Sequence, residues 1–119
     1  MNPQEHIPLS PRDFLILLVL VDGPLHGWGI VKAVEERVGD EVRIDPANLY
    51  RSMKRLQRDG IAVETERPPE EAPAEQRRYF ELTELGRAVV AAEAQRLARL
   101  TSEARGANLV LGEPDESTG

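Results

Sequence analysis

The pattern of apolar and polar positions along the chain predicts four helices, of which the first is apolar on every side. Ser10 and Pro11 are a favourable N-cap and first helical residue, residues 14–21 are all apolar, and Gly23 follows the end of the helix. A helix without a polar face is buried on most sides. We therefore expect one face of this helix in the domain core and another face against a partner subunit.

The second and third helices are amphipathic. Apolar residues at helical spacing predict helices over residues 26–38 and 46–59, with a short strand over residues 42–44 between them. Asp45 as N-cap with Pro46 at the first helical position is the strongest start signal in the chain. The third helix has an apolar stripe and an opposite cationic face, formed respectively by Leu49, Met53 and Leu56 and by Ala47, Arg51, Lys54, Arg55 and Arg58.

A hairpin and a last helix complete the predicted elements. Alternation predicts half-buried strands over residues 61–67 and 78–82, joined by a proline-rich acidic loop that is too long for a tight turn. The loop length suggests function or mobility. The last helix is expected to end near residue 105, and its apolar positions repeat every ~3.5 residues, the spacing of a helix–helix seam. The seam consists of Val90, Ala94, Leu97, Thr101 and Ala104.

Three helices followed by a hairpin is the element order of a winged helix-turn-helix. In that fold the third helix is presented to the DNA major groove and the hairpin forms the wing. The expected fold class is α+β, mainly α: a winged helix-turn-helix with an added C-terminal dimerisation helix. We expect a flexible N-terminus over residues 1–8, the DNA-binding domain over 9–83, the dimerisation helix over 84–105 and a disordered tail over 106–119.

The distribution of charge matters more than its sum. The formal net charge of −6 taken alone argues against nucleic acid as a partner, because phosphate binding depends on lysine and arginine. The acidic residues, however, gather over residues 35–41, 70–75 and 113–116, whereas basic residues cluster over 51–58 and 77–78. A DNA-binding protein needs a local positive face and not a positive average.

Several classes of protein are excluded by what the chain lacks. It has no cysteine and two histidines, so disulfides and thiolate zinc sites are ruled out and no converging set of metal ligands is present. Neither a nucleophile elbow nor a glycine-rich phosphate loop occurs, so we expect no enzyme and no cofactor. With no secretory leader recognised and no apolar run near the ~20 residues that span a bilayer, we expect a cytoplasmic protein without a membrane partner.

Four stretches resemble the PadR family of transcriptional regulators. Residues 25–30 (Leu-His-Gly-Trp-Gly-Ile) resemble the family's His-Gly-Tyr-Gly-Ile signature, and residues 48–56 resemble its recognition helix, with Leu-Tyr followed by a Leu-x-Arg-Leu-like pattern. The segment after this helix in the family is matched by residues 59–61 (Asp-Gly-Ile). The second wing strand and the start of the last helix are matched by residues 77–87. The order and spacing of the four stretches are those of the family, and the resemblance covers about residues 9–105.

The resemblance implies a dimeric repressor or activator, often released from DNA by a small effector. The single last helix is similar to the subgroup with a short C-terminal region, in which this helix and the first helix form the dimer interface. Three features depart from the family pattern. Ala47 and Asn48 replace the usual Gly and Thr or Ser, Trp28 replaces Tyr, and the wing tip is acidic. The acidic tip puts its own contact with phosphates in doubt, because like charges repel.

Two sets of functional residues follow from these patterns. Double-stranded DNA is expected to contact the cationic helix and the wing, through Asn48, Tyr50, Arg51, Lys54, Arg55, Arg77 and Arg78. The partner subunit of a homodimer is expected to contact the first and last helices, through Phe14, Leu17, Leu18, Val90, Ala94, Leu97 and Thr101. Arg77 and Arg78 have an alternative role, in which they pair with Glu64 or Glu66 across the hairpin.

Alternatives remain for single residues and for the whole chain. Trp28 is interpreted as a core aromatic, with stacking on a planar effector as the alternative, and His26 as a structural or capping residue. A small pocket between subunits, lined by the apolar first helix and by Val90, Ala94 and Leu97, is a further hypothesis for the effector. The alternative function is a winged-helix protein-interaction module, suggested by the acidic average charge and acidic wing, since fold alone does not settle function.

Overall fold

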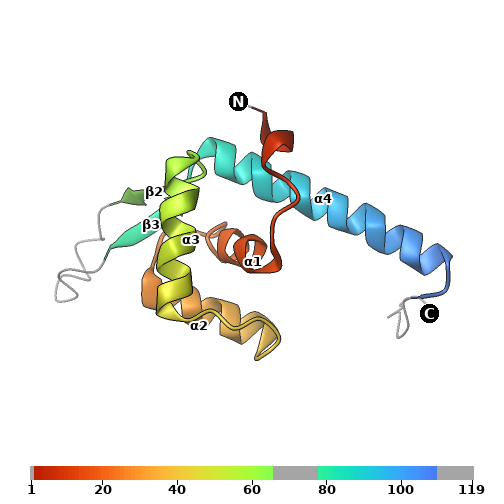
Figure 1. Ribbon diagram of the computed structural model, residues 1–119, viewed down its shortest axis with the longest axis horizontal. Helices are drawn as coiled ribbons and strands as arrows, with labels where there is room; N and C mark the ends of the chain where they lie inside the picture. Colours follow the sequence, from red (N-terminus) through yellow and green to blue (C-terminus); the bar gives the residue numbers. More distant parts are fainter. Residues whose placement is uncertain (1, 66–77, 110–119) are drawn as a thin grey trace.

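The computed structural model describes residues 2–65 and 78–109 as a mainly helical fold with a small antiparallel sheet (Figure 1). In chain order the elements are the 3-10 helix η1 (Pro3–His6), α1 (Pro11–Val19), β1 (Leu25–His26), α2 (Gly27–Val38), α3 (Pro46–Arg58), β2 (Ala62–Thr65), β3 (Tyr79–Leu82) and α4 (Glu84–Gly106). The four expected helices and both hairpin strands are confirmed. Together they form a winged helix-turn-helix extended by α4.

Side-chain caps begin each of the four α-helices. The Ser10 hydroxyl accepts from the backbone N–H of Asp13, and the Asp45 carboxylate accepts from that of Asn48 at 2.8 Å. His26 Nδ1 accepts from the N–H of Gly29 at 3.0 Å, which confirms the capping role expected for this histidine. Thr83 caps α4 in the same way. These bonds satisfy N–H groups that a helix start leaves without a partner.

The sheet has the strand order β1-β3-β2, and both pairs are antiparallel. Leu25 pairs with Phe80, and Ala62 pairs with Leu82. The strand expected over residues 42–44 is wrong, since this segment forms no ladder. Leu25 and His26 of β1 occupy the free edge of β3 instead. In the segment before α3, Ile44 is buried and Val42 packs against the core.

The hydrophobic core surrounds α1. Ile16, Leu17 and Leu20 are fully buried within the single chain, whereas Phe14 and Leu18 are partly exposed. The core is completed by residues from every other α-helix and from the sheet, including Ile30, Val34, Met53, Leu56, Ile61, Phe80, Leu82 and Val89. The burial of Phe80 and Leu82 confirms the inward positions expected for β3. The apolar character of α1 is thus explained largely by its own domain.

Helix α4 begins against the domain and then extends beyond it (Figure 1). Val89, Val90 and Glu93 in its first half are buried, whereas almost every residue from 94 to 109 is exposed. The N-terminal segment, expected to be flexible, forms η1 and packs against α4. None of the helices among the described residues is both long and apolar enough to cross a membrane.

Candidate nucleic-acid interface

Helix α3 presents a cationic face to solvent. Leu49, Ser52, Met53 and Leu56 are buried on one side, which confirms the predicted apolar stripe and adds a buried serine to it. Arg51, Lys54 and Arg58 are exposed on the opposite side. Because the apolar side is anchored in the core, this face is held outward and can approach a phosphate backbone without unfolding any part of the domain.

Asn48 links the start of α3 to Arg51. Its side-chain amide donates to Asp45 Oδ2 at 3.2 Å, and its Oδ1 accepts from Arg51 Nη2 at 2.5 Å. One of the five N–H donors of the guanidinium is used in this bond, and the others remain for a ligand. The three residues therefore hold the Arg51 guanidinium above the first turn of α3, where a recognition helix meets base edges.

Tyr50 and Lys54 form a second pair on α3. The Lys54 ammonium lies 5.7 Å from the centre of the Tyr50 ring, within the range of a cation–π contact. Tyr50 is 52% exposed, so both groups are accessible from solvent. An exposed contact of this kind contributes only ~0.5–1 kcal/mol, and a phosphate group can displace it.

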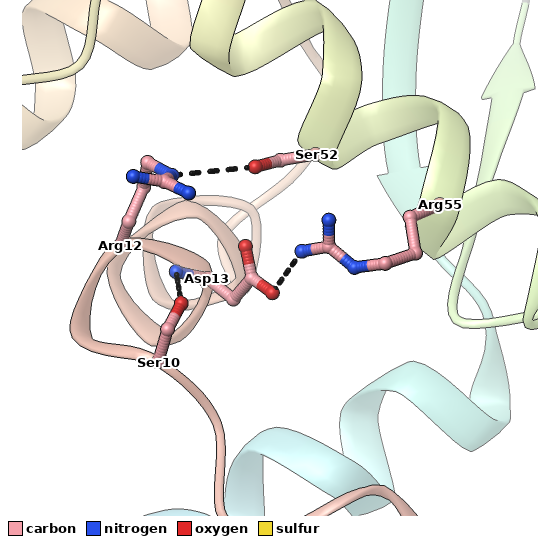
Figure 2. Close-up of polar contacts among 5 residues, drawn as sticks. All are labelled: Ser10, Arg12, Asp13, Ser52 and Arg55. Carbon is pink, nitrogen blue, oxygen red and sulfur yellow. Dashed lines mark hydrogen bonds and ion pairs between the residues drawn. The ribbon is translucent and has the colours of Figure 1, made fainter.

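Arg55 differs from the other predicted DNA contacts. Its guanidinium donates to Oδ2 of Asp13 in α1 and forms an ion pair with that carboxylate (Figure 2). The Arg55 side chain is 40% exposed, and it lies on the flank of α3 rather than on the solvent face. The sequence gives no local signal for this ion pair, because the two residues are 42 positions apart.

The described part of the wing carries one of the two predicted cations. Arg78 Nε lies 3.2 Å from Glu64 Oε2 across the hairpin, and both side chains are exposed. This pairing with Glu64 was the alternative role considered for Arg78. Exposed pairs of this kind contribute little to stability, so Arg78 can exchange its partner. Arg77 and the acidic wing tip lie outside the described residues.

Trp28 is exposed, so its prediction as a core aromatic is wrong. It is 61% exposed, and the Lys32 ammonium lies 5.9 Å from the centre of its ring. The position at the second residue of α2 places the side chain away from the core, which is filled from that helix by Ile30 and Val34. Trp28 lines a largely apolar hollow of about 400 Å³ between α2, α3 and the β3 region. The other lining residues are Gly27, Val31, Pro46, Leu49, Tyr50, Met53, Phe80 and Arg78, which directly precedes β3.

The residues expected at the dimer interface divide into two groups. Leu17 and Val90 are buried within the single chain, and so they are not on its surface. Phe14 and Leu18 are partly exposed, and Ala94, Leu97 and Thr101 are exposed on α4. Leu100, which was not predicted, is 47% exposed beside them. The surface available to a second copy is therefore the outer half of α4 with part of α1.

The sequence of the chain matches a known family over its core. Residues 16–92, from α1 through most of the buried half of α4, match the profile of the "Transcriptional regulator PadR-like family". The chain belongs to this family. One relative of the chain is the "Uncharacterized 37.1 kDa protein in transposon TN4556" of Streptomyces fradiae, which is 40% identical over 92 residues. The match covers 77% of this chain and 24% of that relative, so the chain spans about a quarter of the relative's length.

Solved structures of regulators share the fold. A PadR family transcription regulator from Clostridium difficile R20291 superposes with a TM-score of 0.71 at 22% identity, covering 82% of this chain and 97% of that one. Bordetella bronchiseptica BpsR, described in a study of how 6-hydroxynicotinic acid regulates its DNA binding, superposes with a TM-score of 0.62 at 23% identity, covering 87% and 67%. These similarities support the winged-helix architecture of this PadR-like chain.

Proposed function

We propose that this PadR-like chain is a sequence-specific DNA-binding transcriptional repressor. The observation that carries the proposal is the exposed cationic face of α3, with Arg51, Lys54 and Arg58 opposite a buried apolar stripe. The chain has a net charge of −6, yet cations cluster on this face. Binding to a phosphate backbone needs such a local cluster of cations. A protein-interaction module has little need for that arrangement.

Arg51, Lys54, Tyr50 and Asn48 are the residues that we propose to contact DNA from α3. Asn48 and Arg51 lie in the first turns of the helix, where side chains reach base edges. Arginine can bond to guanine, and asparagine to adenine, through two hydrogen bonds each. Lys54 and the wing residue Arg78 are assigned to phosphates. Arg55 is removed from this set because its charge is already engaged with Asp13.

Binding as a homodimer to a palindromic operator is part of the proposal. The outer half of α4 carries Leu97 and Leu100, which are 36% and 47% exposed. Pairing of two such helices would bury these apolar side chains and relate the two copies of α3 by a two-fold axis. Two recognition helices so related enter successive major grooves, and the operator then has the same symmetry.

The proposal also includes a small effector that releases the protein from DNA. The hollow beside Trp28, about 400 Å³ in volume, lies within the ~300–1,000 Å³ of small-molecule sites. It also adjoins Tyr50 and Arg78, two of the proposed DNA contacts. BpsR, one of the structural relatives, is described as regulated in its DNA binding by a small aromatic acid. The pocket between subunits stays as the alternative place for the effector.

The decisive experiment is fluorescence anisotropy with the DNA region upstream of the protein's own gene, and a scrambled duplex of equal composition as reference. We expect tight, salt-dependent binding with a clear preference for the upstream fragment. Equal and weak binding to both duplexes in the presence and absence of candidate effectors would contradict the proposal. Protein binding by a winged-helix interaction module would then be the better-supported function.

Replacing Arg51 or Lys54 with alanine should weaken binding to the preferred fragment. Loss of a base contact by Arg51 costs ~1–3 kcal/mol and relaxes specificity, whereas loss of a phosphate contact by Lys54 lowers the salt slope by about one unit. Both effects are measured by anisotropy titrations at several salt concentrations. Arg99→Ala, which removes an exposed cation from α4, is the matched control. Unchanged affinity in both α3 variants would refute the assignment.

Replacing Leu97 with glutamate should convert the dimer to a monomer. Two buried carboxylates facing each other across a two-fold seam are each costly to desolvate and repel one another. Sedimentation velocity measures the change in mass. Gln95→Glu adds the same charge at an exposed position on the opposite side of α4 and should leave the dimer intact. A Leu97→Glu variant that sediments like the wild type would place the dimer interface elsewhere.

A further inference from the structure

Two side-chain contacts join the start of α1 to the middle of α3 (Figure 2). The Arg55 guanidinium from α3 donates to Oδ2 of Asp13, and Arg12 Nε from α1 donates to the Ser52 hydroxyl at 3.4 Å. Asp13 and Ser52 are both buried. Adjacent residues of α1 therefore contact two residues of α3 that lie about one turn apart. Because α3 is held at two points, these contacts oppose its rotation against α1.

Asp13 is held in place from its own helix. Its backbone N–H donates to the Ser10 hydroxyl at 3.0 Å, and its carboxylate lies in the first turn of α1, where the helix dipole favours a negative charge. Within the described residues, Oδ1 of Asp13 has no hydrogen-bond partner. A buried carboxylate is costly unless it is paired. Arg55 is the cation that compensates this charge.

The contact lies on the path between the recognition helix and α4. Helix α1 packs against α2 and α4, so a feature that ties α3 to α1 also sets the position of α3 relative to α4. Arg55 follows Lys54 directly and lies one turn after Arg51. A rotation of α3 at Arg55 would displace both of these proposed DNA contacts.

We propose that Asp13 is a positioning residue for DNA recognition: through Arg55 it fixes the orientation of α3 on α1, and hence the directions of Arg51 and Lys54. The inference rests on the proposed function as a DNA-binding protein. It gives Arg55 a different role from the phosphate contact that the sequence predicted. It also gives a role to an acidic residue that lies against the cationic helix, where its charge opposes DNA binding.

Positioning and simple competition for Arg55 predict opposite results for Asp13→Asn. If Asp13 only withholds Arg55 from DNA, the variant frees a cation and removes an anion, so binding tightens and the salt slope steepens by about one unit. If Asp13 positions α3, the variant loosens the helix and weakens binding despite the more favourable charge. The sign of the change in affinity separates the two.

The test uses the full chain, with the upstream fragment and the scrambled duplex at several salt concentrations. The wild type is titrated first. No preference in the wild type would overturn the proposed function and this inference with it. If the wild type prefers the upstream fragment, Asp13→Asn should bind that fragment on the order of tenfold more weakly, equivalent to ~1.4 kcal/mol. Binding to the scrambled duplex and the salt slope should stay unchanged. Tighter binding with a steeper slope overturns the inference alone.

Two further variants separate positioning from misfolding. Asp59→Asn removes one negative charge from the residue that ends α3, beside the same hollow that Asp13 and Arg55 line, and it should bind DNA as tightly as the wild type or more tightly. Arg55→Gln and the double variant Asp13→Asn/Arg55→Gln complete a cycle. We expect the double variant to bind no more weakly than either single variant, because both act through one contact. Additive losses, or a salt slope lowered by Arg55→Gln in both backgrounds, would overturn the inference.

Discussion

Replacing Gly86 with alanine should destabilise the domain by at least ~3 kcal/mol, the upper end of the cost of overpacking. A Cβ atom at Gly86 would lie 2.1 Å from the carbonyl oxygen of Ile61, far inside van der Waals contact. That carbonyl is backbone and is itself held, since it accepts from Thr83 N at 3.1 Å and from the Thr83 hydroxyl at 3.1 Å. To make room, the start of α4 would have to move away from Ile61 and lose these bonds.

Urea unfolding followed by circular dichroism measures this effect. Gly106→Ala is the control on the same helix, because a Cβ there meets nothing within 4 Å. That variant should be as stable as the wild type or more stable by up to ~1 kcal/mol, from the better helix propensity of alanine. A Gly86→Ala variant with wild-type stability would show that α4 does not approach Ile61 so closely.

Much of the fold was predictable because its signals are local. The start of α3 follows from Asp45 and Pro46, and the cap of α2 from His26, in each case through a bond spanning three residues. The strand β1 was missed since two residues carry too little alternation to be recognised. Its existence depends on Leu25 finding the free edge of β3, a partner far away in the sequence.

The candidate site was predictable in outline and not in detail. The spacing of Leu49, Met53 and Leu56 determines which face of α3 is buried, and so which cations are exposed. It does not reveal that Arg55 turns toward Asp13, because that pairing depends on how α1 lies beside α3. Trp28 shows the same limit: an aromatic type suggests burial, yet its place at the start of α2 leaves it on the surface.

Replacing Glu93 with glutamine should lower the free energy of unfolding by about 2 kcal/mol, as for the loss of charged hydrogen bonds. Glu93 is 1% exposed. Its carboxylate accepts from Arg96 at 2.7 and 2.8 Å and from the backbone N–H of Leu9 at 3.0 Å, and so ties the N-terminal segment to α4. A glutamine has one acceptor oxygen and must point its NH₂ group at one of these donors. The cost stays below that of a fully buried ion pair because Arg96 is partly exposed and can be hydrated.

The same carboxylate should make stability depend on pH. The hydrogen bonds from Arg96, and to a lesser degree that from Leu9, hold the pKa of Glu93 below its ordinary value of 4.5 against the opposing effect of burial. An acid whose pKa is lowered on folding stabilises the folded state fully above the ordinary value, and the contribution is lost as the pH falls through the lowered one. Urea unfolding should therefore show wild type and Glu93→Gln converging in stability as the pH falls below 4.5. Glu103→Gln, at an exposed position of α4, should show the same pH dependence of stability as the wild type.

A difference in stability between wild type and Glu93→Gln that stays constant as the pH falls would contradict this prediction. It would mean that the ionised carboxylate of Glu93 is not what holds the N-terminal segment to α4.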